Sequence, residues 1–375
     1  MTDIPPMFTP FRLREMETPN RVMVSPMCQF AADDGLIGDW HIAHLGSFAV
    51  GGAGIVCTEM TDVSPEGRIS PGCAGMYKRE HVGAWKRVVD FVHGFGTAKI
   101  AIQLAHAGAK ASTRIPWERE KGPLTPADGG WQVIGPSAVP FEPDGPVPKE
   151  MDRADMDRVI GDFARGAEMA DQAGFDMIEL HGAHGYLLSA FLSPLMNQRT
   201  DDYGGALVNR VRFPLEVFDA VRAAWPAEKP ICIRLSTTDS VEGGQTVADT
   251  VDVAKAFRAH GCDIIDCSAG GTKFGVRPAW DAETQIPIAA QIRRDAGIPT
   301  IAVGGIVGVR QVNQVIAEGK ADICALGRMH LTDPHFTLRA AAELGYHDQF
   351  WPVRYRGAKM QAEALAEAAA RQAAE

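Results

Sequence analysis

Short apolar runs alternate with longer amphipathic stretches along almost the whole chain, and this alternation limits the possible folds more than any other feature. Eight apolar runs cover residues 21–25, 53–59, 98–104, 175–181, 230–236, 262–268, 299–305 and 321–327. Stretches with helical periodicity cover residues 41–50, 81–93, 152–173, 209–224, 246–260, 284–296 and 309–318, and a last helix begins near Arg328. Apolar runs followed by amphipathic helices are typical of parallel strands that are covered on both faces.

Eight such strand–helix units predict an α/β fold, the (β/α)8 TIM barrel, which typically needs ~250 residues and tolerates insertions. A doubly wound sheet is the alternative, but it usually has fewer strands, and no GxGxxG motif opens a helix after the first run. We expect one barrel domain over residues 1–355 and a tail helix over residues 356–375. Residues 107–150, rich in Pro and Gly, form a lid-like insertion after strand 3.

Charge and composition exclude some classes of partner. The formal net charge is −10, which argues against nucleic acid as the main partner. No apolar run approaches the ~18 residues of a membrane span, and the N-terminus lacks a signal-peptide pattern, so we expect a cytoplasmic protein without a membrane partner. The seven cysteines form no CxxC pair, so we expect free thiols and no metal.

Glycines end the last two predicted strands, at Gly304, Gly305 and Gly327, and Arg328 follows directly. Barrels often bind phosphate at this position, where exposed N–H groups and an Arg side chain favour an anion. Either glycine cluster alone is equally well explained as a turn. Together, on these two strands, they predict a phosphate site.

His181, His184 and Tyr186 follow the fourth predicted strand. A zinc site would need a third ligand. The other interpretation is a pair of imidazole donors that polarise a carbonyl oxygen, with Tyr186 delivering a proton to the carbon beside it. One structural His together with one active-site His, and a Tyr that only packs at a helix start, remain the simpler alternatives.

Arg234 and Gln103 lie within apolar strands, where a polar side chain needs a partner. The anionic N1 edge of a reduced flavin would satisfy Arg234, and a flavin pyrimidine edge suits Gln103. An ion pair with a carboxylate such as Glu179, and a hydrogen bond to a neighbouring strand, are the structural alternatives.

Four motifs resemble the old yellow enzyme family, in the same order and on the same strands. They are SPMCQ at 25–29, QLAHAG at 103–108, HGAHGYLLSAFLSPLMNQRTDDYGG at 181–205, and ADICALGR at 321–328. The resemblance extends from Phe8 to about Tyr355. Cys28 is similar to the cysteine of the xenobiotic-reductase-like, or thermophilic-like, subclass.

The resemblance implies a homo-oligomeric ene-reductase of the NADPH dehydrogenase type, with non-covalent FMN and NADPH or NADH as electron donor. The substrates would be enones, enals, maleimides or nitroalkenes. Tyr186, His181, His184 and Cys28 would be catalytic, with Tyr186 as proton donor and Cys28 tuning the flavin. FMN would contact Ser25, Pro26, Met27, Cys28, Met60, Gln103, Arg234, Gly304, Gly305, Gly327 and Arg328. Substrate would contact Phe30, Lys110, His181, His184 and Tyr186.

The chain departs from the family pattern at three places. Phe30 stands where the subclass usually has Tyr, and Ala109 stands where the family usually has Arg. The arginine that reaches a neighbouring subunit's site has two candidates, Arg354 and Arg356. A homodimer or homotetramer is implied.

Other functions remain open from the sequence. Related flavin barrels act as demethylases or amine dehydrogenases, or reduce aryl-CoA substrates. A non-catalytic FMN-binding protein would not need the His181, His184 and Tyr186 set. A metal-dependent hydrolase would have to recruit Glu59, Glu179 or Asp266.

Overall fold

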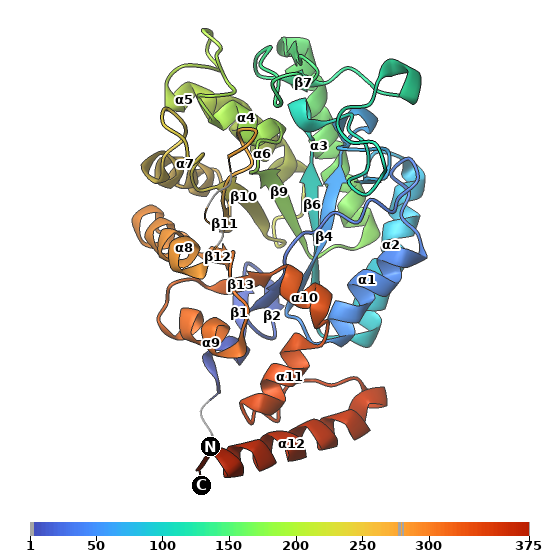
Figure 1. Cartoon of the computed structure of the whole chain (residues 1–375), viewed down its shortest axis with the longest axis vertical. Coiled ribbons are helices and arrows are strands. Elements are labelled where there is room, and N and C mark those ends of the chain that lie inside the picture. Colours follow the sequence, from blue (N-terminus) through green and yellow to red (C-terminus); the bar gives the residue numbers. More distant parts are fainter. Residues whose placement is uncertain (1–3, 277–278, 280, 375) are drawn as a thin grey trace.

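The computed structural model describes residues 4–276, 279 and 281–374, and its centre is a closed barrel of eight parallel strands (Figure 1). Neighbours follow chain order, and the first barrel strand pairs with both the second and the last, which closes the ring. The strands are β3 (Val22–Val24), β4 (Ile55–Asp62), β6 (Lys99–Ala105), β9 (Met177–Gly182), β10 (Ile231–Ser236), β11 (Ile264–Ser268), β12 (Thr300–Val303) and β13 (Ile323–Leu326). The predicted TIM barrel is confirmed.

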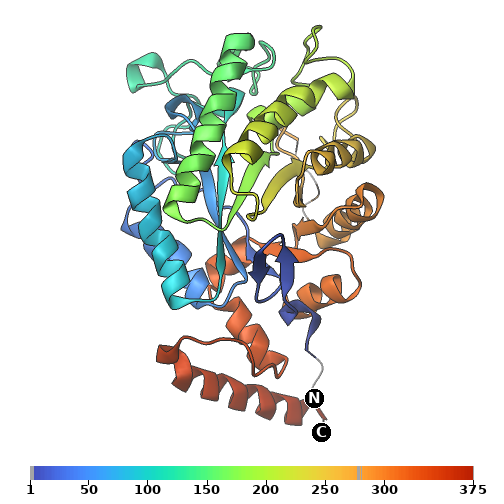
Figure 2. The same cartoon turned by 180° about the vertical axis from the view of Figure 1, so that it is seen from behind.

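Helices cover the outside of the barrel, as the two opposite views show (Figure 2). The longer ones are α1 (Asp39–Val50), α2 (Arg79–Phe95), α3 (Arg153–Ala173), α6 (Arg212–Ala224), α7 (Val247–Ala259), α8 (Ala282–Ala296), α9 (Val309–Ala317) and α11 (Phe336–Glu343). Shorter ones are α4 (Leu187–Leu192), α5 (Leu207–Arg210) and α10 (Arg328–Thr332). Each predicted strand and helix has a counterpart with slightly different ends.

Helix α3 illustrates how local sequence sets these ends. The Asp152 carboxylate accepts a hydrogen bond from the N–H of Asp155 at 2.9 Å, which caps the first turn. The helix stops at Gly174, whose φ of +91° is a left-handed conformation that glycine adopts without strain. The chain can therefore turn directly into β9.

An antiparallel hairpin, which the sequence patterns do not predict, closes the amino-terminal end of the barrel. Its strands are β1 (Phe11–Leu13) and β2 (Met16–Thr18). Leu13 and Met16 pack on inward-facing residues of the barrel, including Met23 and Ile55. Strands of three residues are too short for a recognisable alternation, so only the tertiary contact reveals them.

The insertion over residues 107–150 lies at the carboxyl ends of the strands, above β6 and β4 in Figure 1. It contains the 3-10 turns η3 (Gly108–Lys110) and η4 (Pro126–Asp128), and the short paired strands β7 (Ile134–Gly135) and β8 (Lys149–Glu150). β5 (Ala74–Gly75) extends the sheet beside β4. The insertion therefore stands on the side of the barrel where we expect the active site.

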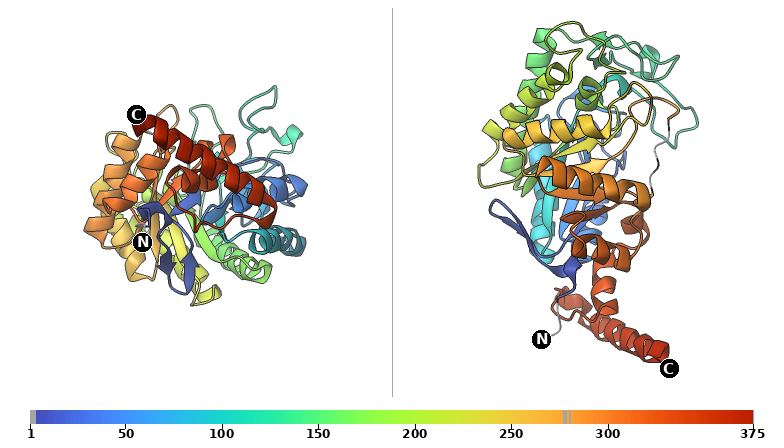
Figure 3. Two further views of the ribbon diagram at one scale, coloured as in Figure 1. Left: turned by 90° about the horizontal axis from the view of Figure 1, so that it is seen from below. Right: turned by 90° about the vertical axis from the view of Figure 1, so that its left-hand side faces the viewer.

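The tail forms helix α12 (Arg356–Ala374), after the 3-10 turn η5 (Val353–Tyr355). Figure 3 shows it extending at the end of the molecule that bears the chain termini, away from the insertion. Its inner side packs on α11, while Met360 and Leu365 stay exposed. Within the described residues, no helix combines the length and apolar character needed to cross a membrane.

The barrel interior changes from apolar to polar along the strands. Near the hairpin it is filled by side chains such as Ile55, Met177, Ile264 and Ile323. One step further along the strands, the interior holds Gln103, Glu179, Arg234 and Asp266, all buried. This polar layer lies next to the carboxyl-terminal face, which positions the candidate site.

Candidate active site

A cavity of about 700 Å³ opens at the carboxyl ends of the barrel strands. Nine of the residues predicted for the site line it: Ser25, Pro26, Met27, His184, Arg234, Gly304, Gly305, Gly327 and Arg328. They come from opposite ends of the sequence, and the closed barrel brings them together. The cavity is large enough for a ligand of drug size.

At one end of the cavity, neighbouring segments of backbone lie so close together that only glycine fits. Gly304 and Gly305 have φ angles of +112° and +65°. A Cβ on Gly305 would lie 2.3 Å from the backbone nitrogen of Ala282, so α8 packs directly against this turn. Arg328 is exposed and forms no ion pair with the described part of the chain. This end of the cavity therefore offers the positive charge of a guanidinium and the backbone N–H groups of glycines, as a phosphate site requires.

His181, His184 and Tyr186 form one aromatic cluster. The ring centroids of His181 and His184 lie 5.0 Å apart, and those of His181 and Tyr186 lie 4.8 Å apart. His184 has a φ of +62°, a conformation that costs a non-glycine residue ~1–3 kcal/mol. Its backbone N–H donates to the hydroxyl of Ser236 at 2.8 Å, which helps to hold this conformation.

Burial and the nearby Arg234 charge lower the pKa of both His181 and His184 well below the usual value. Both imidazoles are therefore neutral at physiological pH, and each carries one N–H. Neutral imidazoles can donate a hydrogen bond to an oxygen that gains negative charge. The structure thus brings together the predicted donor pair with the protonation state that this role needs.

Tyr186 lies beside Lys110, at the junction between the insertion and the loop after β9. Burial raises the pKa of the Tyr186 phenol well above its usual value. The Lys110 ammonium lies 4.8 Å from the centre of the Tyr186 ring and donates to the carbonyl of His184 at 2.8 Å. Burial lowers the pKa of Lys110 to about 8. Because its own pKa is raised, Tyr186 keeps its proton at neutral pH and can serve as a proton donor.

Arg234 and Gln103 have protein partners that differ in part from the alternatives weighed from sequence. Arg234 pairs with Asp266, with Nε and Oδ2 3.4 Å apart, and not with Glu179. Gln103 donates to Glu179 at 2.7 Å. The terminal nitrogens of Arg234 donate to the hydroxyls of Ser25 at 3.4 Å and Ser268 at 3.3 Å, and the guanidinium lines the cavity. The site therefore fits an anionic or strongly accepting ligand, as the N1 edge of FMN would be.

Cys28 and Met60 pack in the same region as Tyr186. All three belong to one apolar cluster that also contains Val133 of the insertion. Burial raises the pKa of the Cys28 thiol well above its usual value, so it is a thiol and not a thiolate. Phe30 has a φ of +50° and contacts Trp117 of the insertion. Among the described residues, no group of three His, Cys, Asp or Glu side chains is placed to hold a metal ion.

Ser268 is a site residue that sequence reasoning missed. Its hydroxyl lies 2.7 Å from Nε2 of His184 and accepts from Arg234 at 3.3 Å, so it connects two predicted site residues. Ser268 ends a predicted strand, and this position alone was the available signal. Serine at a strand end is too common to be singled out without the contact.

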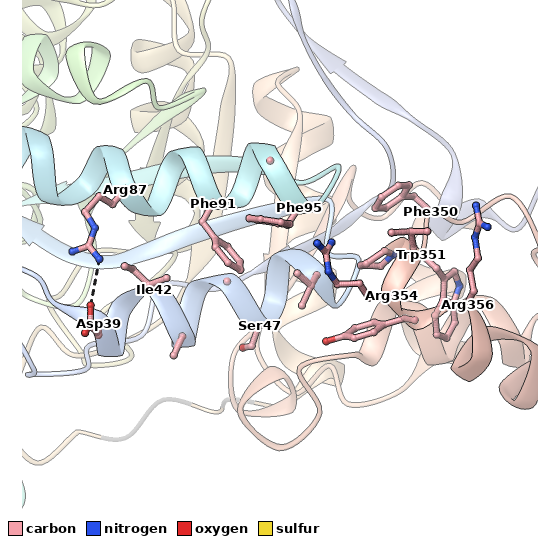
Figure 4. A pocket seen from close by; sticks show the side chains of 17 residues that line it. Asp39, Ile42, Ser47, Arg87, Phe91, Phe95, Phe350, Trp351, Arg354 and Arg356 are labelled. Atoms are coloured by element: carbon pink, nitrogen blue, oxygen red, sulfur yellow. Dashed lines mark hydrogen bonds and ion pairs between the residues drawn. The ribbon is translucent and has the colours of Figure 1, made fainter.

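A larger hollow, of about 1140 Å³, lies away from this chemistry (Figure 4). It runs between α1, α2 and residues 350–356, and we call it the α1–α2 groove. Its lining is mostly apolar, with Phe91, Phe95 and Val353, and it contains none of the strand-end residues. The guanidinium of Arg354 lies over the ring of Phe95, 5.7 Å from its centre. Size alone therefore does not identify the active site here.

Comparisons with known proteins identify the family and the fold. Residues 6–346 match the NADH:flavin oxidoreductase / NADH oxidase family. The chain is 40% identical over 354 residues to NADPH dehydrogenase of Geobacillus thermodenitrificans, covering 93% of this chain and 97% of the relative. Morphinone reductase superposes with a TM-score of 0.75 at 27% identity, covering 90% of this chain and 89% of that one. A 2-naphthoyl-CoA reductase complex shares the fold, with a TM-score of 0.78 at 24% identity over 88% of this chain and 51% of that one.

Proposed function

The chain belongs to the NADH:flavin oxidoreductase / NADH oxidase family, and on this basis we propose that it reduces activated carbon–carbon double bonds. It is an enzyme that uses FMN and a nicotinamide nucleotide. The proposed substrates are enones, enals, maleimides and nitroalkenes, in which an oxygen-bearing group activates the double bond. The observation that carries the proposal is the cluster of neutral His181, neutral His184 and protonated Tyr186 beside the cavity.

The proposed cofactor contacts form two groups. Gly304, Gly305, Gly327 and Arg328 would bind the phosphate of FMN, because they offer backbone N–H groups and a guanidinium. Ser25, Pro26, Met27, Cys28, Met60, Gln103 and Arg234 would surround the ring system. When bound, FMN carries hydride from the nicotinamide nucleotide to the substrate.

The protein residues would supply polarisation and a proton. His181 and His184 would donate hydrogen bonds to the carbonyl or nitro oxygen and draw electrons from the double bond. Tyr186 would then give its phenolic proton to the carbon next to that group. Lys110 and Phe30 would border the substrate, with the insertion above them.

A second proposal concerns the subunits: we propose a homodimer or homotetramer in which the α1–α2 groove is a contact surface. The groove is apolar, and Phe95, Phe350 and Val353 on its border are exposed. Large exposed apolar patches mark interaction sites. Neither Arg354 nor Arg356 makes a side-chain hydrogen bond or ion pair within the described residues, but Arg354 is held over the Phe95 ring, whereas Arg356 stands at the far end of the groove (Figure 4). Arg356 is therefore our candidate for the arginine that reaches the active site of a neighbouring subunit.

The cytoplasmic location of the protein stays a prediction.

A spectroscopic titration tests the catalytic proposal. The purified protein should be yellow, lose its colour when NADPH is added without oxygen, and regain it when 2-cyclohexenone follows. A yellow protein that bleaches but does not recolour with any of the four substrate classes would contradict the double-bond assignment. In that case demethylation or amine oxidation would be tested next, by adding an amine substrate in place of NADPH and recording whether the yellow colour is lost.

A further inference from the structure

Two carboxylic side chains and one guanidinium lie together inside the barrel, next to the proposed cofactor site. Glu179 is on β9 and Asp266 is on β11, and both have 0% exposed surface. Between them, on β10, stands Arg234, which faces Asp266 in register and also lines the cavity. The proposed function uses Gln103 and Arg234 but gives no role to the two acids.

The hydrogen bonds around the two acids are unequal. Glu179 accepts from Nε2 of Gln103 at 2.7 Å and from the Cys232 thiol at 3.7 Å. Neither carboxylate oxygen of Asp266 accepts a hydrogen bond from an N–H or O–H of the described residues. Its charged neighbour is Nε of Arg234 at 3.4 Å, and a buried carboxylate that accepts no hydrogen bond is strongly destabilising. Each of the two acids shifts the pKa of the other, so a proton on Glu179 would supply the missing donor.

The count of charges in this buried layer also indicates that one of the two acids is protonated. Arg234 contributes one positive charge, and the two acids would contribute two negative charges if both were ionised. The other polar groups that face them are neutral: thiols of Cys57 on β4 and Cys232 on β10, and hydroxyls of Ser25 and Ser268. His181 and His184 are neutral as well. One proton on the pair therefore makes the buried layer neutral.

The pKa of Glu179 agrees with this count. Burial and the neighbouring Asp266 charge raise the pKa of Glu179 to about 8, although Arg234 and the bond from Gln103 oppose the rise. Burial also raises the pKa of Asp266, while Arg234 lowers it. Asp266 thus lies beside the cation, and the proton belongs on Glu179.

We propose that Glu179 and Asp266 share one proton and act as the positioning pair of the cofactor site. Protonated Glu179 fixes the amide of Gln103 with its NH2 toward the acid, which leaves the amide oxygen free to accept from a ligand. Asp266 fixes the guanidinium of Arg234. The inference rests on the proposed function, because Gln103 and Arg234 are assigned there to FMN.

A pH dependence follows from this arrangement. Loss of the shared proton leaves a net negative charge beside Arg234, and this weakens the attraction of Arg234 for an anionic ligand. Negative charge added at the cofactor edge would in turn hold the proton on Glu179 to a higher pH. The midpoint potential of bound FMN should therefore respond to the ionisation of the pair.

The variants that separate positioning from bulk structure are Glu179→Gln and Glu179→Met. Glutamine can accept from Gln103 and donate to Asp266, so it reproduces the protonated acid without its titration. Methionine has similar length but leaves Gln103 and Asp266 without partners. We expect FMN affinity to fall about tenfold or more in E179M and to stay near wild type in E179Q. Exposed Glu168 on α3 provides the control E168Q, which removes one charge far from the barrel interior.

The decisive measurement is the midpoint potential of bound FMN between pH 6 and 9. We expect the wild-type and E168Q curves to bend near pH 8 and to separate from the E179Q curve above that pH. Parallel curves for wild type and E179Q would overturn the proposal.

An infrared measurement tests the shared proton without depending on flavin chemistry. The difference spectrum between wild type and E179Q at pH 6 should show the C=O stretch of one protonated carboxylic acid, and this band should disappear at pH 10. Absence of the band at pH 6 would overturn the proposal. If the protein binds no FMN but shows the band, the proposed function fails while the shared proton stands.

Discussion

The rings of Phe30 and Trp117 meet edge to face, with their centroids 5.6 Å apart. The contact joins the loop after β3 to the insertion after β6, and it lies on the side of the barrel that holds the site. Trp117 is 65% exposed, so burial in a core does not explain a tryptophan at this position. The contact with Phe30 does explain it. Such an aromatic pair contributes about 0.5–1.5 kcal/mol beyond its buried area.

Trp117→Ala should therefore loosen the insertion above the substrate. We expect the KM for 2-cyclohexenone to rise about 3- to 10-fold, because ~1 kcal/mol of ordering is lost. The kcat should change less, because no group of the reaction is removed. Steady-state kinetics with Trp117→Phe as the matched control should show near-normal KM, and equal KM values in both variants would contradict a lid role.

Tyr186→Phe should slow substrate reduction selectively. General acid catalysis typically contributes ~10²–10⁴-fold, so reoxidation by the enone should slow by at least about 100-fold. Bleaching by NADPH needs no proton from Tyr186 and should keep its rate. Stopped-flow absorbance separates the two half-reactions. Tyr346, which stacks on Phe8 outside the site, provides Tyr346→Phe as the control. Equal losses in both half-reactions would point to a structural role.

Arg328→Gln should weaken FMN binding but not riboflavin binding. The guanidinium would face the phosphate, and loss of a charge-assisted bond costs about 1.5–3 kcal/mol, or roughly 10- to 100-fold in Kd. Riboflavin lacks the phosphate and should bind both proteins alike. Fluorescence titration measures both ligands, and Arg310→Gln on α9 is an exposed control. A similar loss for both ligands would place the phosphate elsewhere.

His106 should make the folded protein sensitive to acid. Burial lowers the pKa of His106 to about 4, and the usual value of 6.5 applies to the unfolded chain. Between these values the unfolded state binds more protons, so stability is full above pH 6.5 and falls as pH approaches 4. The loss from this group is at most about 3 kcal/mol.

The variant His106→Asn tests this acid sensitivity. Nδ1 of His106 accepts from the N–H of Gly108 at 3.0 Å, and an asparagine oxygen can take over that bond. Denaturant unfolding at pH 7 and pH 4.5 should show a smaller loss of stability in the variant than in wild type. Identical losses in the two proteins would exclude His106 as a source of the acid sensitivity.

Val353→Glu should disrupt the proposed subunit contact. Val353 is 58% exposed and lines the α1–α2 groove, so a charge there is tolerated in an isolated chain but opposes burial against a partner. Light scattering after size-exclusion chromatography should show a smaller assembly, with unchanged circular dichroism. Glu substitution at Leu365, exposed on α12, is the control outside the groove. An unchanged mass for Val353→Glu would move the interface elsewhere.

The sequence by itself determined the barrel, and the resemblance of its four motifs supplied most of the proposed site residues. Strands buried on both faces leave a strong apolar signal, and the barrel places the residues at its strand ends, such as His181 and Gly327, on one face irrespective of the loops.

Only the tertiary structure decided which side chains touch. The pairing of Arg234 with Asp266 and not Glu179, the bridge from Ser268 to His184, and the contact of Phe30 with Trp117 all join distant segments. Neighbouring barrel strands present several polar side chains at similar depth, so periodicity cannot choose among the partners. Closure of the barrel fixes the register between strands, and the register sets both the contacts and the protonation states of the buried groups.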